Sequence, residues 1–211
     1  MPFDIWLAFT AAVLVIVAVP GPTVILVVAY GLAQGRRVAL ASALGVALGD
    51  LIAISASLAG LGALLLASAT AFAVLKWIGA AWLFWLGIRL LRSPPPEIAA
   101  SGAGAAPRHG PTARRVFLHA AIVTALNPKG ILFILAFAPQ FIRPSLPLLP
   151  QLLMMLATFV LLGGLNALAY ALFASRLRQH IRRPATLAWF NRAGGGALIG
   201  LGLLAATATR K

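Results

Sequence analysis

Two residues of opposite charge stand inside long apolar segments, and they are the first candidates for chemistry. Asp50 lies about twelve residues into the segment VALASALGVALGDLIAISASLAGLGALLL, which in a helix is a depth of roughly 18 Å. Lys129 lies near the middle of the segment VFLHAAIVTALNPKGILFILAFAPQF. If these segments cross a bilayer, an acid at that depth costs about 2.5–3.5 kcal/mol. Charged residues in such positions usually line a pathway or relay protons.

The two charges allow two interpretations. In the first they form a structural ion pair that locks two parts of the chain together. In the second a substrate that carries both charges competes for them, with its carboxylate on Lys129 and its ammonium on Asp50. Protonation of Asp50 would then couple transport to a proton gradient.

Two breaks rich in proline and glycine interrupt the apolar segments that begin each half of the chain. The first is PGP at 20–22 and the second is NPKG at 127–130. Proline removes a backbone donor and clashes with the preceding turn, so each break ends a helix. Lipid cannot satisfy the freed N–H and C=O groups, so the breaks must face protein or a wet cavity, where half-helix ends attract ions. The candidate substrate- or proton-binding residues at the breaks are Pro20, Gly21, Pro22, Thr23, Asn127, Pro128 and Gln140.

Simpler structural roles remain open for several features. A proline kink that only bends a packed helix would also produce either break. Asn166, in LLGGLNALAY, is a further candidate for contact with substrate or protons, but hydrogen bonding between helices would account for it. The G-x-x-x-G spacings at Gly45 and Gly49, and at Gly196 and Gly200, favour close helix packing within a subunit or between the subunits of a homodimer.

The composition is that of a helical membrane protein. The 211 residues are 62% hydrophobic and 9% charged, with a mean hydropathy of +1.00, whereas soluble domains carry about 25% charged residues. Six apolar segments are long enough to span a bilayer, which takes about 20 residues. They lie near 4–30, 38–66, 70–91, 116–142, 148–174 and 186–207. We therefore predict an all-α integral membrane protein with six transmembrane helices.

The formal net charge of +14 is placed between the apolar segments. Arginines gather after the first, third and fifth segments, and the other connections carry few basic residues. By the positive-inside rule the arginine-rich connections face the cytoplasm, so both termini are predicted on the non-cytoplasmic side. The charge is thus a topology signal and argues against a nucleic-acid partner.

One linker divides the segments three and three. It is SPPPEIAASGAGAAPRHGPTARR at 93–115, whose composition predicts a flexible cytoplasmic connection. We predict a first three-helix repeat at 1–92 and a second at 116–211. An odd number of spans repeated in tandem inserts its second copy upside down, and such inverted repeats build transporters with broken helices near the bilayer midplane. Here the predicted helices 1 and 4 are the broken ones.

Several kinds of chemistry are disfavoured. The chain has no cysteine, and its three histidines are scattered, so we expect no metal site and no cofactor. One deep acid without a deep histidine disfavours an intramembrane enzyme. No G-x-x-x-x-G-K-[ST] motif is present, which disfavours an ATP-driven pump.

Four motifs together carry a resemblance to a known family. They are PGP at 20–22, Gly49-Asp50, NPK at 127–129 and PQF at 139–141. The pattern resembles the LysE/RhtB family of amino-acid exporters over nearly the whole chain, and is closer to the homoserine/threonine and leucine branch. The resemblance implies a secondary exporter of small neutral amino acids or related zwitterions in the bacterial inner membrane, driven by protons or the membrane potential. A passive channel or an intramembrane enzyme is the alternative function.

Overall fold

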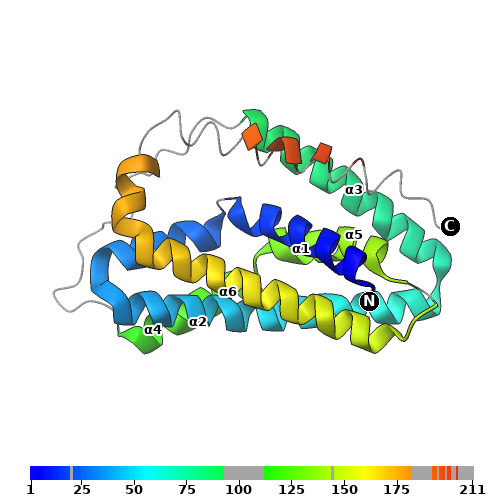
Figure 1. Ribbon diagram of the computed structural model, residues 1–211, viewed down its shortest axis with the longest axis horizontal. Helices are drawn as coiled ribbons and strands as arrows, with labels where there is room; N and C mark the ends of the chain where they lie inside the picture. Colours follow the sequence, from blue (N-terminus) through cyan, green and yellow to red (C-terminus); the bar gives the residue numbers. More distant parts are fainter. Residues whose placement is uncertain are drawn as a thin grey trace.

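The structure is a computed structural model that describes residues 1–19, 21–92, 112–143, 145–181 and, near the C-terminus, 192–193, 195–197, 199–200 and 203. In this part of the chain every regular element is a helix, which confirms the predicted all-α class. Most of the predicted linker at 93–115 and of the predicted sixth span at 186–207 lies outside the described residues. The helices are α1 (Phe3–Ala18), α2 (Pro22–Ala67), α3 (Ala69–Arg92), α4 (Ala113–Ala125), α5 (Pro128–Phe137), the 3-10 helix η2 (Ala138–Phe141) and α6 (Leu148–Ile181) (Figure 1).

Both expected helix breaks are present. Helix α1 ends at Ala18, and the axis of Phe3–Ala18 is bent by 62° from that of Pro22–Gly31. Helix α4 ends at Ala125, and Ala113–Ala125 is bent by 41° from Pro128–Phe141. A proline stands at the start of each second piece, where its missing N–H removes no helical hydrogen bond and its fixed φ suits the helix.

The connection between the first two expected spans is helical. The sequence predicted spans at 4–30 and 38–66 with an arginine-containing gap between them, but α2 runs unbroken over 46 residues, Pro22–Ala67. Figure 1 shows α2 turning back at one end of the molecule, so that its beginning and its remainder lie side by side. Gly31 and Gly35 lie in the gap GLAQGRR, and the candidate membrane segments end at Gly31 and begin again at Arg37, close to the predicted bounds.

Two to four segments of the described chain are long and apolar enough to cross a membrane. Arg37–Leu64 and Leu148–Phe173 qualify alone, with mean hydropathies of 2.0 and 2.1, and each bent pair qualifies if it is counted as one span. These four correspond to the first, second, fourth and fifth predicted spans, and α3 places a 24-residue helix over the third. Six spans and the inverted repeat stay predictions.

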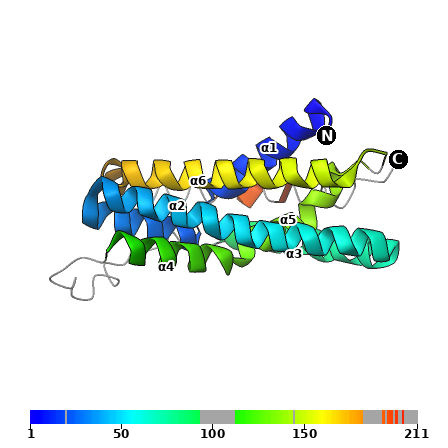
Figure 2. The same ribbon diagram turned by 90° about the horizontal axis from the view of Figure 1, so that it is seen from below.

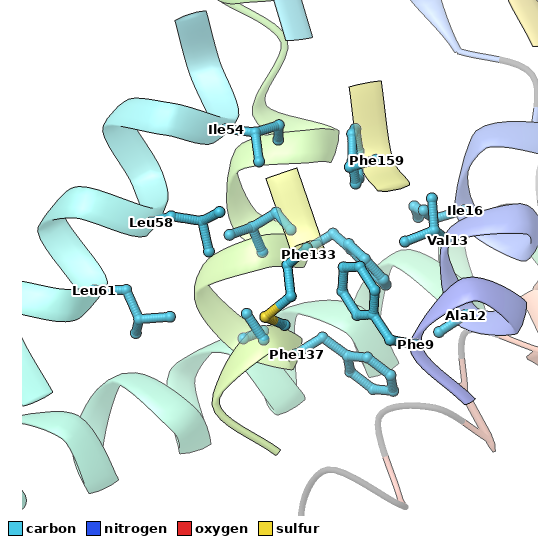
Figure 3. Packing of buried hydrophobic residues seen from close by; sticks show 14 of the residues in the cluster. Phe9, Ala12, Val13, Ile16, Ile54, Leu58, Leu61, Phe133, Phe137 and Phe159 are labelled. Carbon is cyan, nitrogen blue, oxygen red and sulfur yellow. The ribbon is translucent and has the colours of Figure 1, made fainter. Parts of the chain in front are cut away.

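A hydrophobic core packs α1 and α5, which each form one side of a helix break, against the long helices α2 and α6 (Figure 3). It contains Phe9 of α1, Ile54 of α2, Phe133 and Phe137 of α5, and Phe159 of α6, all 3% exposed or less. The rings of Phe133 and Phe137 are stacked with centroids 5.3 Å apart, and that of Phe133 lies 6.2 Å from that of Phe159. Burying these large rings fixes α1 and α5 beside α6.

Helix α2 lies between α4 and α6 (Figure 2). Glycines let its backbone approach α4: a Cβ at Gly45 would contact Phe117 O, and one at Gly49 would lie 2.6 Å from Ala121 O. This G-x-x-x-G spacing therefore serves packing within the chain. Around Gly196 and Gly200, by contrast, a Cβ would meet no described atom within 4 Å.

The connection from η2 to α6 is held by one buried side chain. Gln151 Oε1 accepts a hydrogen bond from Arg143 N at 2.8 Å, and Gln151 Nε2 donates to Arg143 O, Leu146 O and Pro147 O at 3.0–3.2 Å. These bonds satisfy backbone groups that lie outside any helix. They also fix where α6 starts, and with it the positions of the α6 residues described below.

Candidate functional site

The two helix breaks meet at one cavity of about 50 Å³. That volume has room for about three to five water molecules. Residues from α1, α2, α4, α5 and α6 line it, so both halves of the chain contribute. Its polar lining residues are Thr23, Asp50, Thr124, Asn127, Lys129 and Asn166.

Asp50 presents its carboxylate to this cavity. The residue is 9% exposed. A Cβ on Gly163 of α6 would contact Asp50 Oδ2, so the oxygen can occupy this position only because residue 163 is a glycine. Within the described chain no group donates a hydrogen bond to the carboxylate, and no fully buried side-chain oxygen lacks a partner. The Asp50 oxygens therefore reach the cavity and are available to a ligand.

Lys129 directs its ammonium group to the first break. Its Nζ donates hydrogen bonds to Ile16 O at 3.0 Å and Val19 O at 2.8 Å. Asp50 and Lys129 line the same cavity and attract each other electrostatically, but in the described chain no direct ion pair within 4.0 Å joins them. The structure therefore does not contain the direct Asp50–Lys129 ion pair that the structural interpretation requires. The lysine is instead hydrogen-bonded to the end of α1.

Two further side chains bind the same end of α1. Asn166 Nδ2 donates to Val17 O at 3.0 Å, and Tyr170 Oη donates to Ala18 O at 3.1 Å. Asn166 and Tyr170 are four residues apart on α6 and so share one helix face. The break is therefore stabilised by side chains that lie about 110–150 residues further along the chain.

The second break is capped locally and tied to the first. Asn127 is the N-cap of α5: its Oδ1 accepts from Lys129 N at 3.1 Å. Its Nδ2 donates to Thr23 Oγ1 at 3.1 Å, and Thr124 Oγ1 donates to the same oxygen at 3.4 Å. Thr23 lies in the first turn of α2, so these bonds hold the N-terminal ends of α2 and α5 close to each other.

The start of α2 leaves backbone donors near the cavity. Its N-cap, Gly21, supplies no side-chain cap, and Thr23 and Val24 of its first turn both line the cavity. A Cβ at Gly21 would lie 3.4 Å from Lys129 Nζ, an ordinary van der Waals contact, so the ammonium lies directly beside this N-cap. Uncapped N–H groups at a helix N-terminus favour an anion such as a carboxylate.

Most of the predicted site residues lie together. Thr23, Asp50, Asn127, Lys129 and Asn166 all line the cavity. Gly21, Pro22 and Pro128 form the breaks beside it. Gln140 does not line the cavity: it lies in η2, and its Nε2 donates to Ala136 O at 3.3 Å. Pro20 lies outside the described residues.

Sequence reasoning missed four residues. Thr124 and Phe159 line the cavity, Gly163 accommodates Asp50, and Tyr170 binds the end of α1. A helical spacing would have pointed to two of them, because Gly163 and Tyr170 lie three residues before and four residues after Asn166. The described residues contain no group of three His, Cys, Asp or Glu side chains that could hold a metal ion.

Comparison with known proteins gives relatives along the full chain. An uncharacterized membrane protein of Vibrio cholerae is 33% identical over 208 residues, covering 99% of both chains. The homoserine/homoserine lactone efflux protein of Salmonella typhimurium is 34% identical over 212 aligned residues, covering 99% of this chain and 98% of its own. The leucine efflux protein of an Enterobacter species is 28% identical over 187 residues, covering 88% and 85%.

No solved structure matches the chain significantly. The model of one family, LysE type translocator, matches residues 14–209. This match spans both helix breaks and every cavity residue, and it confirms the resemblance drawn from the sequence motifs. The chain is a membrane protein that belongs to the LysE type translocator family.

Proposed function

We propose that this protein is a secondary active exporter of small neutral amino acids, similar to homoserine, threonine or leucine, across the bacterial inner membrane. The observation that carries the proposal is the cavity at the two helix breaks, which holds a carboxylate with no hydrogen-bond partner among the described residues, an ammonium group and a helix N-terminus without a side-chain cap. Membership of a translocator family and relatives named for homoserine and leucine efflux support it.

The charges of the cavity match those of a zwitterion. The ammonium of an amino acid would bind the Asp50 carboxylate, which no described group occupies. Its carboxylate would bind the first-turn N–H groups of α2 and the remaining N–H of Lys129, which uses two of its three donors for carbonyls. Helix N-termini inside membrane transporters bind substrate carboxylates in the same way.

The walls of the cavity favour a neutral side chain. Val24, Val27, Ile54 and Phe159 are apolar lining residues, and Asp50 is the only acid among the residues that line it. A basic substrate would bring a second cation with no further acid to receive it. At about 50 Å³ the cavity must widen to admit an amino acid, as an alternating-access cycle requires.

Proton coupling is assigned to Asp50. A carboxylate within the membrane that lines the substrate cavity can carry a proton and an ammonium alternately, because the two compete for the same charge.

Efflux of preloaded amino acids from proteoliposomes tests the proposal. With the full-length protein and an imposed proton gradient, we expect preloaded homoserine, threonine or leucine to leave the vesicles faster than it leaves vesicles that contain no protein. Basic amino acids serve as the comparison substrates. A protonophore should reduce the gradient-driven rate.

The same assay distinguishes the alternatives. Efflux that is unaffected by Asp50→Asn and by the protonophore would indicate a passive channel. Disappearance of the amino acid with appearance of a chemically changed product would indicate an intramembrane enzyme.

A further inference from the structure

The C-terminal end of α1 is fully hydrogen-bonded although its helix is broken. Val15 O accepts from Val19 N at 3.3 Å, Val17 O from Asn166, and Ala18 O from Tyr170. The other two carbonyls, Ile16 O and Val19 O, are bound by the Lys129 ammonium. A side-chain cation, rather than a neutral donor, thus completes the end of this helix.

The end of α1 has the chemistry of a cation site. The carbonyl end of a helix carries partial negative charge, and half-helix ends in membrane transporters coordinate monovalent cations. The Lys129 nitrogen lies 3.0 and 2.8 Å from two of these oxygens, at hydrogen-bond distance. Ile16, Val17 and Lys129 all line the cavity, so the site is reached from it.

We propose that the C-terminal end of α1 is a subsite for a primary ammonium group, which the side chain of Lys129 fills in this structure. The inference deepens the proposed function and rests on it in one respect, because a zwitterionic substrate brings a second ammonium into the same cavity. Lys129 and the substrate then share two negative groups, the α1 carbonyls and the Asp50 carboxylate. The lysine acts as a tethered cation in addition to any contact with the substrate carboxylate.

Chemical rescue of a truncated lysine tests the subsite. Lys129→Ala leaves Ile16 O and Val19 O without their donor, and free ethylammonium can replace it. In the purified full-length variant, ethylammonium at ten times its Kd should raise Tm by about 3–6 °C. Wild-type protein, whose subsite is filled, should shift by less than a third of that amount.

Two controls locate the bound cation. Tetramethylammonium at the same concentration has the same charge but no N–H donor, so it should not raise Tm. The double variant Asp50→Asn with Lys129→Ala should keep the ethylammonium shift, because the carbonyls remain. A shift that needs Asp50, that tetramethylammonium reproduces, or that is absent from Lys129→Ala would overturn the proposal.

A second variant keeps the test decisive if Lys129→Ala does not fold. The side chain of Lys129→Gln is neutral and one bond shorter than lysine, so it leaves the subsite without its cation, and ethylammonium should stabilise this variant in preference to tetramethylammonium. Equal effects of the two cations would refute the subsite. Because the readout is stability, the two proposals can fail separately. If wild-type protein does not export amino acids but Lys129→Ala shows the ethylammonium shift, the proposed function alone is refuted. If wild-type protein exports them but Lys129→Ala shows no shift, the subsite alone is refuted.

Discussion

Gly163→Ala tests whether the position of the Asp50 carboxylate determines substrate affinity. The added methyl group would contact Asp50 Oδ2, so the carboxylate has to move away from the place it now occupies. Overpacking of this kind costs about 1–3 kcal/mol, and alanine regains about 1 kcal/mol of helix propensity over glycine. The free energy of unfolding should therefore fall by about 0–2 kcal/mol, which leaves the protein folded.

The effect on substrate binding should be larger than the effect on stability. A hydrogen bond between charged groups contributes about 1.5–3 kcal/mol. Loss of the ammonium–Asp50 contact would therefore raise the KM for export by about 10–150-fold. The maximal rate should change less, because the pathway itself is not blocked.

The neighbouring glycine supplies a matched control. A Cβ at Gly164 would lie 3.3 Å from Ala47 Cβ, a contact between two methyl groups that a small shift relieves. Gly164→Ala should therefore keep KM within about twofold of the wild-type value. The assay is the concentration dependence of homoserine efflux from proteoliposomes, with Tm measured on the same preparations. A wild-type KM for Gly163→Ala, or equal losses in the two variants, would refute the role assigned to the carboxylate.

Three further predictions use the same preparations or whole cells. Asp50→Asn should abolish gradient-driven efflux, and adding Lys129→Gln should not restore it; wild-type efflux from the double variant would leave only a structural role for both charges. Replacing Asn127 and Pro128 by alanine should heal the second break and remove export while membrane insertion, measured by fractionation, is unchanged; wild-type export rates would show the break to be an ordinary kink. Reporter fusions within 93–115 should read cytoplasmic and fusions at the C-terminus external; a cytoplasmic C-terminus would contradict the six-span topology.

The breaks and the charged residues were predictable because their causes are local. Proline and glycine at 20–22 and 127–130 end helices whatever the surroundings. Asp50 and Lys129 stand out because an apolar segment tolerates a charge only where protein or water receives it. The cavity that contains both residues agrees with that reasoning.

The partners of these groups were not predictable, because tertiary packing decides them. Lys129 was expected to face Asp50 or a substrate carboxylate, yet its hydrogen bonds go to carbonyls more than 100 residues earlier in the chain. Gly163 and Tyr170 share a helix face with Asn166, but the groups that they contact follow only from the approach of α6 to α2 and α1. The bounds of the first two spans were predicted, but the helical connection between them was not, because arginine, which marks a loop in a topology argument, is also a good helix former.

The hydrogen bonds at the end of α1 limit which parts of the protein can move during transport. All four side-chain donations to this end come from α5 and α6, and the acceptors are carbonyls of the last turn of α1 and of its C-cap, Val19. Breaking all four without replacement by water would cost about 4–12 kcal/mol, whereas the alternative states of a working protein differ by only a few kcal/mol. The end of α1 should therefore move together with α5 and α6. The contact of α2 with α4 combines close glycine packing with two side-chain hydrogen bonds, Tyr30–His119 at 2.8 Å and Thr124–Thr23 at 3.4 Å, so fewer directional bonds hold these two helices together.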